Sequence, residues 1–177
     1  AAGNDGQNNV NDLPLDGNAM YDKLSPRSTA KNGLVVAATN DANIATNGNL
    51  ISVDLYNDSS PGPTDDLRIK PDVSGNGVGV FSTYDKSDSQ YASISGTSMA
   101  TPSVTGSLLL LQQHYTNLNN SFMRAATLKG LTLHTADDIS TPGPDAFSGW
   151  GLLNMKKAAE AISNKGESSI IKELTLA

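Results

Sequence analysis

The sequence contains no cysteine, and this absence removes three classes of site together. A disulfide framework, a thiolate metal site and a cysteine nucleophile all need the sulfur that the chain lacks. Long apolar runs are missing as well. Because no stretch approaches the roughly 18 apolar residues of a transmembrane helix, we expect no membrane-spanning segment and no membrane partner.

Positive charge is scarce, with 12 Lys and Arg against 18 Asp and Glu and a formal net charge of −6. Since binding to a phosphate backbone requires clustered cations, nucleic acid is excluded as an expected partner. What is present fits a soluble globular domain: 177 residues, 37% of them hydrophobic and 17% charged, are enough for a core.

The composition of the two ends of the sequence allows a prediction for each. The chain begins Ala1-Ala2-Gly3-Asn4, without an initiator Met or the basic and apolar segments of a secretion signal. We therefore expect it to start inside a longer polypeptide. Residues 1–30 are rich in Asn, Asp and Gly, which is typical of a surface loop. Residues 168–177 predict a terminal strand or frayed end, with a linker into a further domain as the alternative.

Short apolar runs and helical spacing predict an α/β fold. Residues 33–39 predict a strand buried on both faces, and residues 50–53 and 78–83 predict two further strands. Three- and four-residue spacing predicts helices over residues 98–115, 122–133 and 154–164, the last with Asn154 as its N-cap. The alternation of strands and helices predicts an α/β sandwich around a mainly parallel sheet.

The segment that carries chemistry is Ser-Gly-Thr-Ser-Met-Ala-Thr-Pro at residues 95–102. It places the hydroxyl of Ser98 at the start of a helix, just after a glycine that lets the backbone turn. The unpaired N–H groups and partial positive charge of a helix N-terminus favour an oxyanion there. Ser98 is then a candidate nucleophile if a base can reach it. The pattern alone describes an ordinary serine N-cap equally well, and such caps are the commoner case.

Gly-Thr-Ser-Met-Ala-Thr-Pro resembles the nucleophile motif of subtilisin-like serine proteases, the subtilase family. The resemblance implies that Ser98 is the nucleophile and that Gly96 and Thr97 take part in binding substrate. Ser103 stands where many members have a histidine, but that histidine is not catalytic.

Ala-Ala-Gly-Asn-Asp-Gly at residues 1–6 is similar to the family segment that ends in the oxyanion-hole asparagine. The similarity implies that Asn4 donates to the oxyanion and that Ala1, Ala2 and Gly3 line one wall of the S1 pocket. An Asn-Gly-rich turn is the alternative for this segment taken alone.

Further segments resemble the family in the expected order. Residues 59–66 and 69–73 are similar to the region before the strand that leads to the serine, and Phe-Ser-Gly-Trp-Gly-Leu-Leu-Asn at residues 147–154 resembles the closing segment. Ser-Gly-Asn-Gly at residues 74–77 departs from the usual Ala-Pro-Gly. The resemblance covers residues 1–161 and implies a three-layer α/β sandwich. We expect residues 1–164 to be the C-terminal portion of the catalytic domain and residues 165–177 to be a tail.

The two histidines of the chain do not match the triad base of the family. His114 lies along the nucleophile helix, roughly 24 Å from Ser98 at 1.5 Å per residue, and His134 follows the second helix. The family order Asp, His, Ser places both missing members upstream of Ala1. The resemblance therefore implies a serine endopeptidase that acts through an acyl-enzyme. The alternatives are a catalytically silent structural or binding module, and a nicked enzyme whose N-terminal half binds this piece.

The expected partners are a protein or peptide substrate and the N-terminal half of the same enzyme. No cofactor is expected for the chemistry. Structural calcium stays open at three acidic pairs, namely Asp65 with Asp66, Asp85 with Asp88 and Asp137 with Asp138, although solvated loop acids are the stronger expectation. Family habit implies export from the cytoplasm. Without its N-terminal half, the chain is expected to expose a sheet edge and apolar surface, and so either to oligomerise or to have a weakly protected edge.

Overall fold

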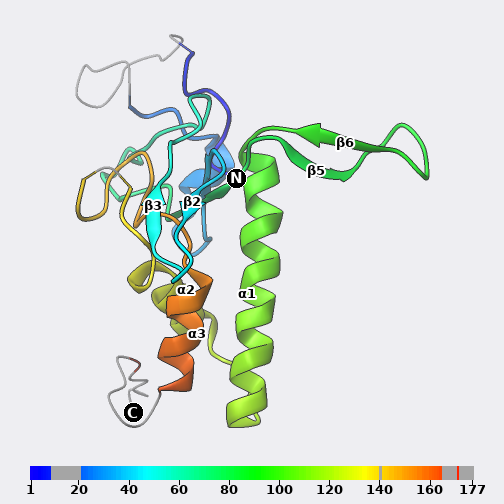
Figure 1. The fold of residues 1–177 in the computed structure, drawn as a ribbon. Helices are drawn as coiled ribbons and strands as arrows, with labels where there is room; N and C mark the ends of the chain where they lie inside the picture. Colours follow the sequence, from blue (N-terminus) through cyan, green and yellow to red (C-terminus); the bar gives the residue numbers. More distant parts are fainter. Residues whose placement is uncertain (9–20, 140, 165–170, 172–177) are drawn as a thin grey trace.

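The structure is a computed structural model that describes residues 1–8, 21–139, 141–164 and 171. Its elements in chain order are the 3₁₀ helix η1 (Pro26–Thr29), the strands β1 (Val36–Thr39), β2 (Asn43–Ile44), β3 (Leu50–Ser52), β4 (Val73–Asn76), β5 (Val80–Thr83) and β6 (Tyr91–Ile94), and the helices α1 (Thr97–Asn119), α2 (Ala125–His134) and α3 (Met155–Ser163). Figure 1 shows their arrangement. The predicted C-terminal strand lies outside the described residues, apart from Ile171.

A parallel pair of strands, β1 and β4, forms the centre of the fold, in a register that runs from Val36 opposite Val73 to Thr39 opposite Asn76. All four residues of β1 are buried, which confirms the predicted strand with two covered faces. The backbone continues this sheet on both sides: the N–H of Ala2 donates to the carbonyl of Val36 at 2.9 Å, and Leu152 forms a parallel bridge with Ser74. The expected α/β fold with a parallel sheet is confirmed.

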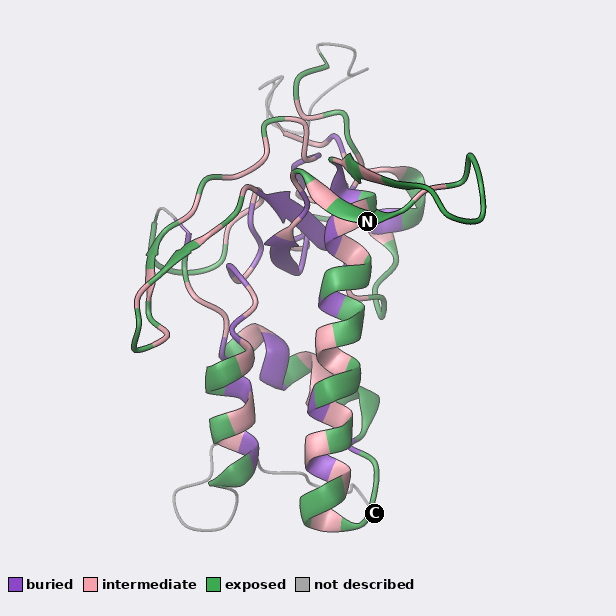
Figure 2. Cartoon of the chain, turned by 45° about the vertical axis from the view of Figure 1, so that its right-hand side comes forward, coloured by how far each residue is buried: buried purple, intermediate pink, exposed green. Residues whose placement is uncertain are grey.

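Helix α1 is the longest element, and it packs against β1, β4 and α3. Its buried residues face this core, while its other side is exposed (Figure 2). The helix ends at Asn120, whose φ of 54° is left-handed and whose N–H donates to the carbonyl of Thr116. It therefore runs beyond the predicted end at residue 115, because the chain offers neither a glycine nor a proline that would stop it there.

The two shorter helices complete the core around the C-terminal half of α1. The buried cluster there joins Leu111 and Tyr115 of α1 to Leu131 of α2 and Ile162 of α3. The prediction of Asn154 as the N-cap of α3 is confirmed, since its side chain accepts a hydrogen bond from the N–H of Lys157 at 2.9 Å. No helix among the described residues is long and apolar enough to cross a membrane.

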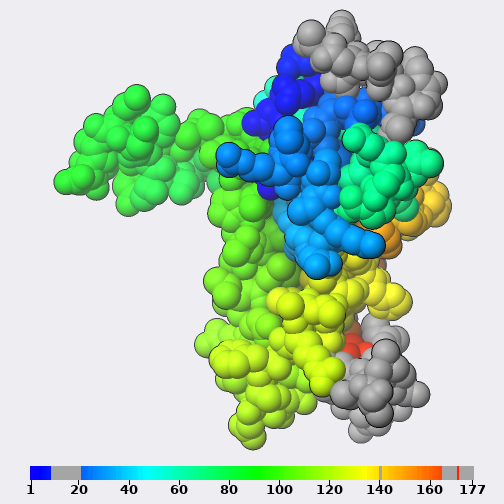
Figure 3. All heavy atoms as spheres, turned by 180° about the vertical axis from the view of Figure 1, so that it is seen from behind, coloured from blue at the N-terminus to red at the C-terminus, as the bar shows by residue number. Residues whose placement is uncertain are grey.

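Two antiparallel hairpins lie outside the central sheet. The pair β2–β3 lies near α3, and the pair β5–β6 projects from the start of α1. Figure 3 shows β5–β6 standing away from the body, with α1 forming the flank below it. Because β6 leads directly into α1, the projecting hairpin and the predicted nucleophile share one short connection at Ser95 and Gly96.

Candidate active site

The turn between β6 and α1 fixes the position of Ser98. Gly96 has φ of 148°, a value that L side chains rarely adopt, and a Cβ there would lie 3.2 Å from the Nδ2 atom of Asn4. Gly96 and Thr97 are buried, whereas Ser98, the second residue of the helix, is exposed. The predicted nucleophile thus stands at the open N-terminus of α1, where helix N–H groups favour negative charge.

Asn4 is held against this turn by Thr97. The Oδ1 atom of Asn4 accepts hydrogen bonds from the N–H of Thr97 at 2.9 Å and from its hydroxyl at 3.0 Å. The same hydroxyl also lies 3.2 Å from both the N–H and the carbonyl oxygen of Gly3. Residues that are 93 and 94 positions apart in sequence therefore meet, and Figure 1 shows the N-terminus of the chain beside the start of α1.

The segment that carries Asn4 is fixed by backbone contacts with its neighbours. Ala2 is fully buried, and its carbonyl accepts a hydrogen bond from the N–H of Ser25. Gly3 has φ of 122°, and a Cβ there would lie 2.7 Å from the Oγ atom of Ser60, so only glycine fits. Of the predicted S1-wall residues, Ala1 is exposed, Gly3 is half-buried and Ala2 is buried.

Ser98 opens into an apolar groove of about 610 Å³ along one side of α1. The residues that line it are Ala1, Ser98, Thr101, Pro102, Thr105, Gly106 and Leu109. Small residues on α1 leave room for another element to approach closely, and Leu109 is 67% exposed at the far end. We call this surface the α1 groove. A group that lies at the Ala1 end of this groove would be next to Ser98.

Neither histidine of the chain lies with Ser98. The Nε2 atom of His114 lies 2.9 Å from the Oγ atom of Ser163 on α3, and His134 is the exposed last residue of α2. Because these are the only two histidines in the sequence, the 177 residues supply a serine and an amide at this site but no imidazole base.

In two of the three acidic pairs considered for calcium, one carboxylate is paired with a basic side chain. Asp137 bonds to Lys157 and, at 2.7 Å, to the Nδ2 atom of Asn154. Asp66 pairs with Arg68, whose guanidinium holds the pKa of this carboxyl at about 2. Asp85 and Asp88 are exposed in the β5–β6 loop. In the described part of the chain, no three His, Cys, Asp or Glu side chains gather as metal ligands do.

A buried ion-pair cluster at the start of β4 was not predicted from the sequence. The carboxylate of Asp72 contacts the ammonium groups of Lys70 at 2.5 Å and Lys129 at 3.0 Å, and it also accepts a hydrogen bond from the N–H of Val35. Both lysines donate to the carbonyl of Gly33. Burial lowers the pKa of Lys70, and the Asp72 carboxylate opposes that shift. The signal available in the sequence was Lys-Pro-Asp directly before the buried strand β4.

Several known proteins are similar to this chain in sequence or in structure. A model of the subtilase family matches residues 1–151. The PII-type proteinase of Lactococcus lactis subsp. cremoris is 33% identical over 131 residues, which cover 65% of this chain and 7% of that proteinase. The extracellular serine protease of Serratia marcescens is 37% identical over 68 residues, which cover 38% of this chain and 6% of that protease.

Among solved structures, the CspB protease of Clostridium perfringens is similar with a TM-score of 0.68 and 25% sequence identity. The likeness covers 82% of this chain and 30% of that protease. The chain therefore spans less than a third of this structure, and only 7% and 6% of the two proteases matched in sequence.

Proposed function

The chain belongs to the subtilase family, and from the placement of Asn4, Thr97 and Ser98 we propose that it carries the nucleophile of a serine endopeptidase. The observation that supports this proposal most strongly is the meeting of Asn4 with the turn before Ser98. An exposed serine at a helix N-terminus is common, but a side-chain amide fixed beside it from 94 residues away is the arrangement that acyl transfer needs.

In the proposed mechanism, the Oγ atom of Ser98 attacks the carbonyl carbon of a substrate peptide bond. A histidine upstream of Ala1 accepts the serine proton and later donates it to the leaving amine, and an upstream aspartate orients that histidine. The bond between the serine oxygen and the carbonyl carbon forms first, and the C–N bond then breaks. Water then attacks the acyl carbon while the histidine accepts its proton. The bond between that carbon and the Ser98 oxygen breaks as the histidine returns the proton to the serine, which releases the carboxylic acid product.

Two donors would stabilise the negative charge on the tetrahedral oxygen. They are the N–H of Ser98, at the positive end of α1, and the Nδ2 group of Asn4. Since the Oδ1 atom of Asn4 is occupied by Thr97, its Nδ2 group is the end that remains for substrate. Removal of one such donor lowers turnover by roughly 10²–10³-fold, a magnitude known from a protease of this family.

Two exposed surfaces of the fold support the proposal that the upstream part of the same enzyme binds to this chain. The α1 groove begins at Ser98, and Leu109 and Leu110 on α1 are 67% and 61% exposed. The segment at Ala1 also lies along the β1 edge that faces away from β4. An upstream polypeptide that covers α1 and extends the sheet at this edge would bring its base to the serine.

A protein or peptide is the proposed substrate, and the proposed location is extracytoplasmic. Both follow from what the relatives are called: one is a proteinase of a lactococcal species and another is an extracellular serine protease. The chemistry of the proposed site needs no metal or cofactor, because a serine, an imidazole and two amide donors suffice for acyl transfer.

Labelling by a fluorophosphonate tests the nucleophile directly. In the complete protein, Ser98→Ala is expected to abolish labelling, whereas Ser103→Ala, an exposed serine five positions along the same helix, should leave it intact. Labelling that survives Ser98→Ala would rule Ser98 out. If the complete wild-type protein is folded but neither labelled nor able to cleave protein substrates, the silent-module alternative replaces the protease proposal.

A further inference from the structure

A second groove lies on the other side of the core, between the β2–β3 hairpin and the chain before residue 140. It has a volume of about 540 Å³ and shares no residue with the α1 groove. We call it the β3 groove. The residues that line it are Asn49, Leu50, Ile51, Ser52, Val53, Asp137, Asp138, Ile139 and Lys157.

The lining of the β3 groove shows that it follows the edge of a strand. Alternate side chains of a strand point to opposite faces, so a groove beneath one face would contact every second residue. Here the residues from Asn49 to Val53 line it without interruption. Among the described residues, β3 has a ladder partner, β2, on one edge. The groove therefore runs along the other edge of β3, the side that a further strand would use.

Both walls of the β3 groove are anchored. On the hairpin side, the ammonium of Lys156 on α3 donates to the carbonyl of Asn47 at 2.5 Å and packs against Gly48. On the opposite side, the backbone of Asp137 exchanges two hydrogen bonds with Leu152, each at 2.8 Å. The space is thus formed before any ligand enters, which lowers the cost of binding.

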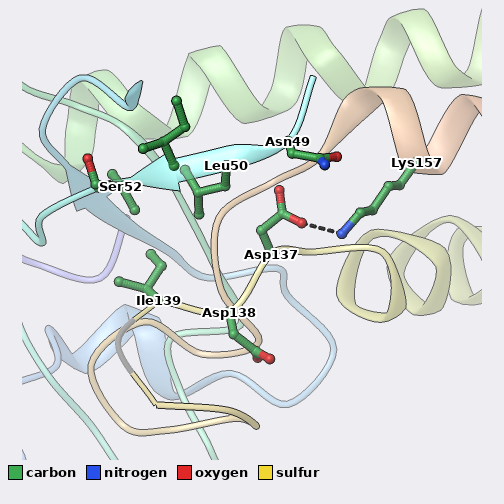
Figure 4. Close-up of a pocket in the computed structure, with 9 residues that line it drawn as sticks. Asn49, Leu50, Ser52, Asp137, Asp138, Ile139 and Lys157 are labelled. Carbon is green, nitrogen blue, oxygen red and sulfur yellow. Dashed lines mark hydrogen bonds and ion pairs between the residues drawn. The ribbon is translucent and has the colours of Figure 1, made fainter. Parts of the chain in front are cut away.

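The side chains in the β3 groove offer apolar contact and one available negative charge. Figure 4 shows Leu50 and Ile139 turned toward the space between the two walls. Lys157 is already engaged with Asp137. Asp138 is exposed and accepts a hydrogen bond from the N–H of Gly143. A volume of about 540 Å³ falls within the range of sites that bind small ligands or short segments.

We propose that the β3 groove binds an extended peptide that adds a strand to the free edge of β3 and carries a lysine or arginine opposite Asp138. Main-chain hydrogen bonds to β3 supply affinity, and the apolar wall at Leu50 and Ile139 receives alternate side chains. The positive side chain complements a protein whose net charge is −6. This inference does not depend on Ser98 being the nucleophile, because the groove is a separate surface.

Fluorescence anisotropy with two labelled peptides tests the proposal on the full-length protein carrying Ser98→Ala, so that cleavage cannot consume the probes. One peptide alternates valine and lysine, and the other alternates valine and glutamate. The lysine peptide is expected to bind and the glutamate peptide to bind weakly or not at all. Asp138→Lys should weaken the lysine peptide by about tenfold and strengthen the glutamate peptide.

The matched control is Asp88→Lys, which makes the same change of net charge on the exposed β5–β6 loop. It should leave both affinities unchanged. Hydrogen exchange gives a second readout that needs no variant: saturating lysine peptide should slow exchange of the amides at residues 49–53. Absence of binding overturns the proposal. So does binding that Asp138→Lys and Asp88→Lys alter equally, or protection that appears at the α1 groove and not at β3.

Discussion

Thr97 fixes which end of the Asn4 amide faces the substrate. A backbone N–H can only donate, so the atom of Asn4 that lies 2.9 Å from the N–H of Thr97 must be the carbonyl oxygen. The hydroxyl of Thr97 donates to the same oxygen and is itself held next to Gly3. The Nδ2 group is then left pointing away from Thr97. We therefore assign Thr97 a positioning role in the proposed oxyanion site.

The positioning role predicts a graded effect of substitution at residue 97. Thr97→Val removes the hydroxyl but keeps the shape and the backbone N–H, so we expect kcat to fall by up to about tenfold with little change in KM, the loss of one neutral hydrogen bond. Thr97→Ser should restore most of the rate. Steady-state kinetics on the complete enzyme would contradict this role if Val and Ser variants behaved alike, or if KM alone changed.

The exposed pair of Arg68 with Asp66 gives a prediction about titration. The pKa of Asp66 stands at about 2 against an ordinary 3.8, chiefly through the hydrogen bond from Arg68 and then that from Thr64. Because the folded-state pKa is depressed, this pair favours folding above about pH 4, and the contribution fades as the pH falls toward 2. Arg68→Gln should raise the pKa of Asp66 toward 3.8, measured by NMR titration. An unchanged midpoint would show that Thr64 alone sets it.

At the scale of elements, the Asp72 cluster joins parts of the chain that are distant in sequence. Asp72 precedes β4, Lys129 lies on α2, and the shared carbonyl of Gly33 precedes β1. The side chain of Asp72 is only 5% exposed, and that of Lys70 only 3%. A buried pair of this kind adds little over an apolar substitute, but removal of one partner leaves the other charge buried and unpaired.

Asp72→Ala is therefore expected to lower the free energy of unfolding by about 3–5 kcal/mol, because it leaves Lys70 without its carboxylate. Denaturant unfolding of the complete protein measures this change. Asp66→Ala, which breaks the exposed pair with Arg68, serves as the control and should change stability little. Equal effects of the two substitutions would mean that the buried cluster does not stabilise the fold.

At the scale of the whole molecule, a polar substitution on the exposed side of α1 should benefit the 177-residue chain alone and destabilise the complete enzyme. Leu109 and Leu110 present apolar surface that an upstream part would bury. Leu109→Gln should reduce self-association of the 177-residue chain, measured by sedimentation. In the complete enzyme the same change should cost about 1.5–3 kcal/mol of stability, the free energy of burying one leucine.

Leu67 provides the control for this pair of measurements, because it is 71% exposed on a loop away from α1. Leu67→Gln should alter neither quantity appreciably. If Leu109→Gln left the complete enzyme as stable as the wild type, the upstream part would not cover this side of α1. The position proposed for the missing base would then be wrong.

Local chemistry allowed much of the fold to be predicted from the sequence. Apolar runs bounded by Gly and Asn predicted β1 and β3, helical spacing predicted α1, α2 and α3, and Asn154 was recognised as a cap because capping depends on neighbouring residues alone. The resemblance to the subtilase family, and not local chemistry, implied that Asn4 and the motif around Ser98 belong to one site, and the structure has Asn4 in contact with Thr97. The end of α1 was predicted less accurately, because no glycine or proline marks it and the helix continues to its left-handed C-cap at Asn120.

The sequence by itself determined the residue types of the proposed site, the absence of cysteine and the presence of only two histidines, because these need no coordinates. Only the tertiary structure decided the orientation of the Asn4 amide, the sharing of Asp72 by two lysines and the β3 groove. Each of these rests on contacts between residues more than 50 positions apart. Such contacts follow from how the strands and helices pack, and a local pattern such as Lys-Pro-Asp before β4 records only one partner of them.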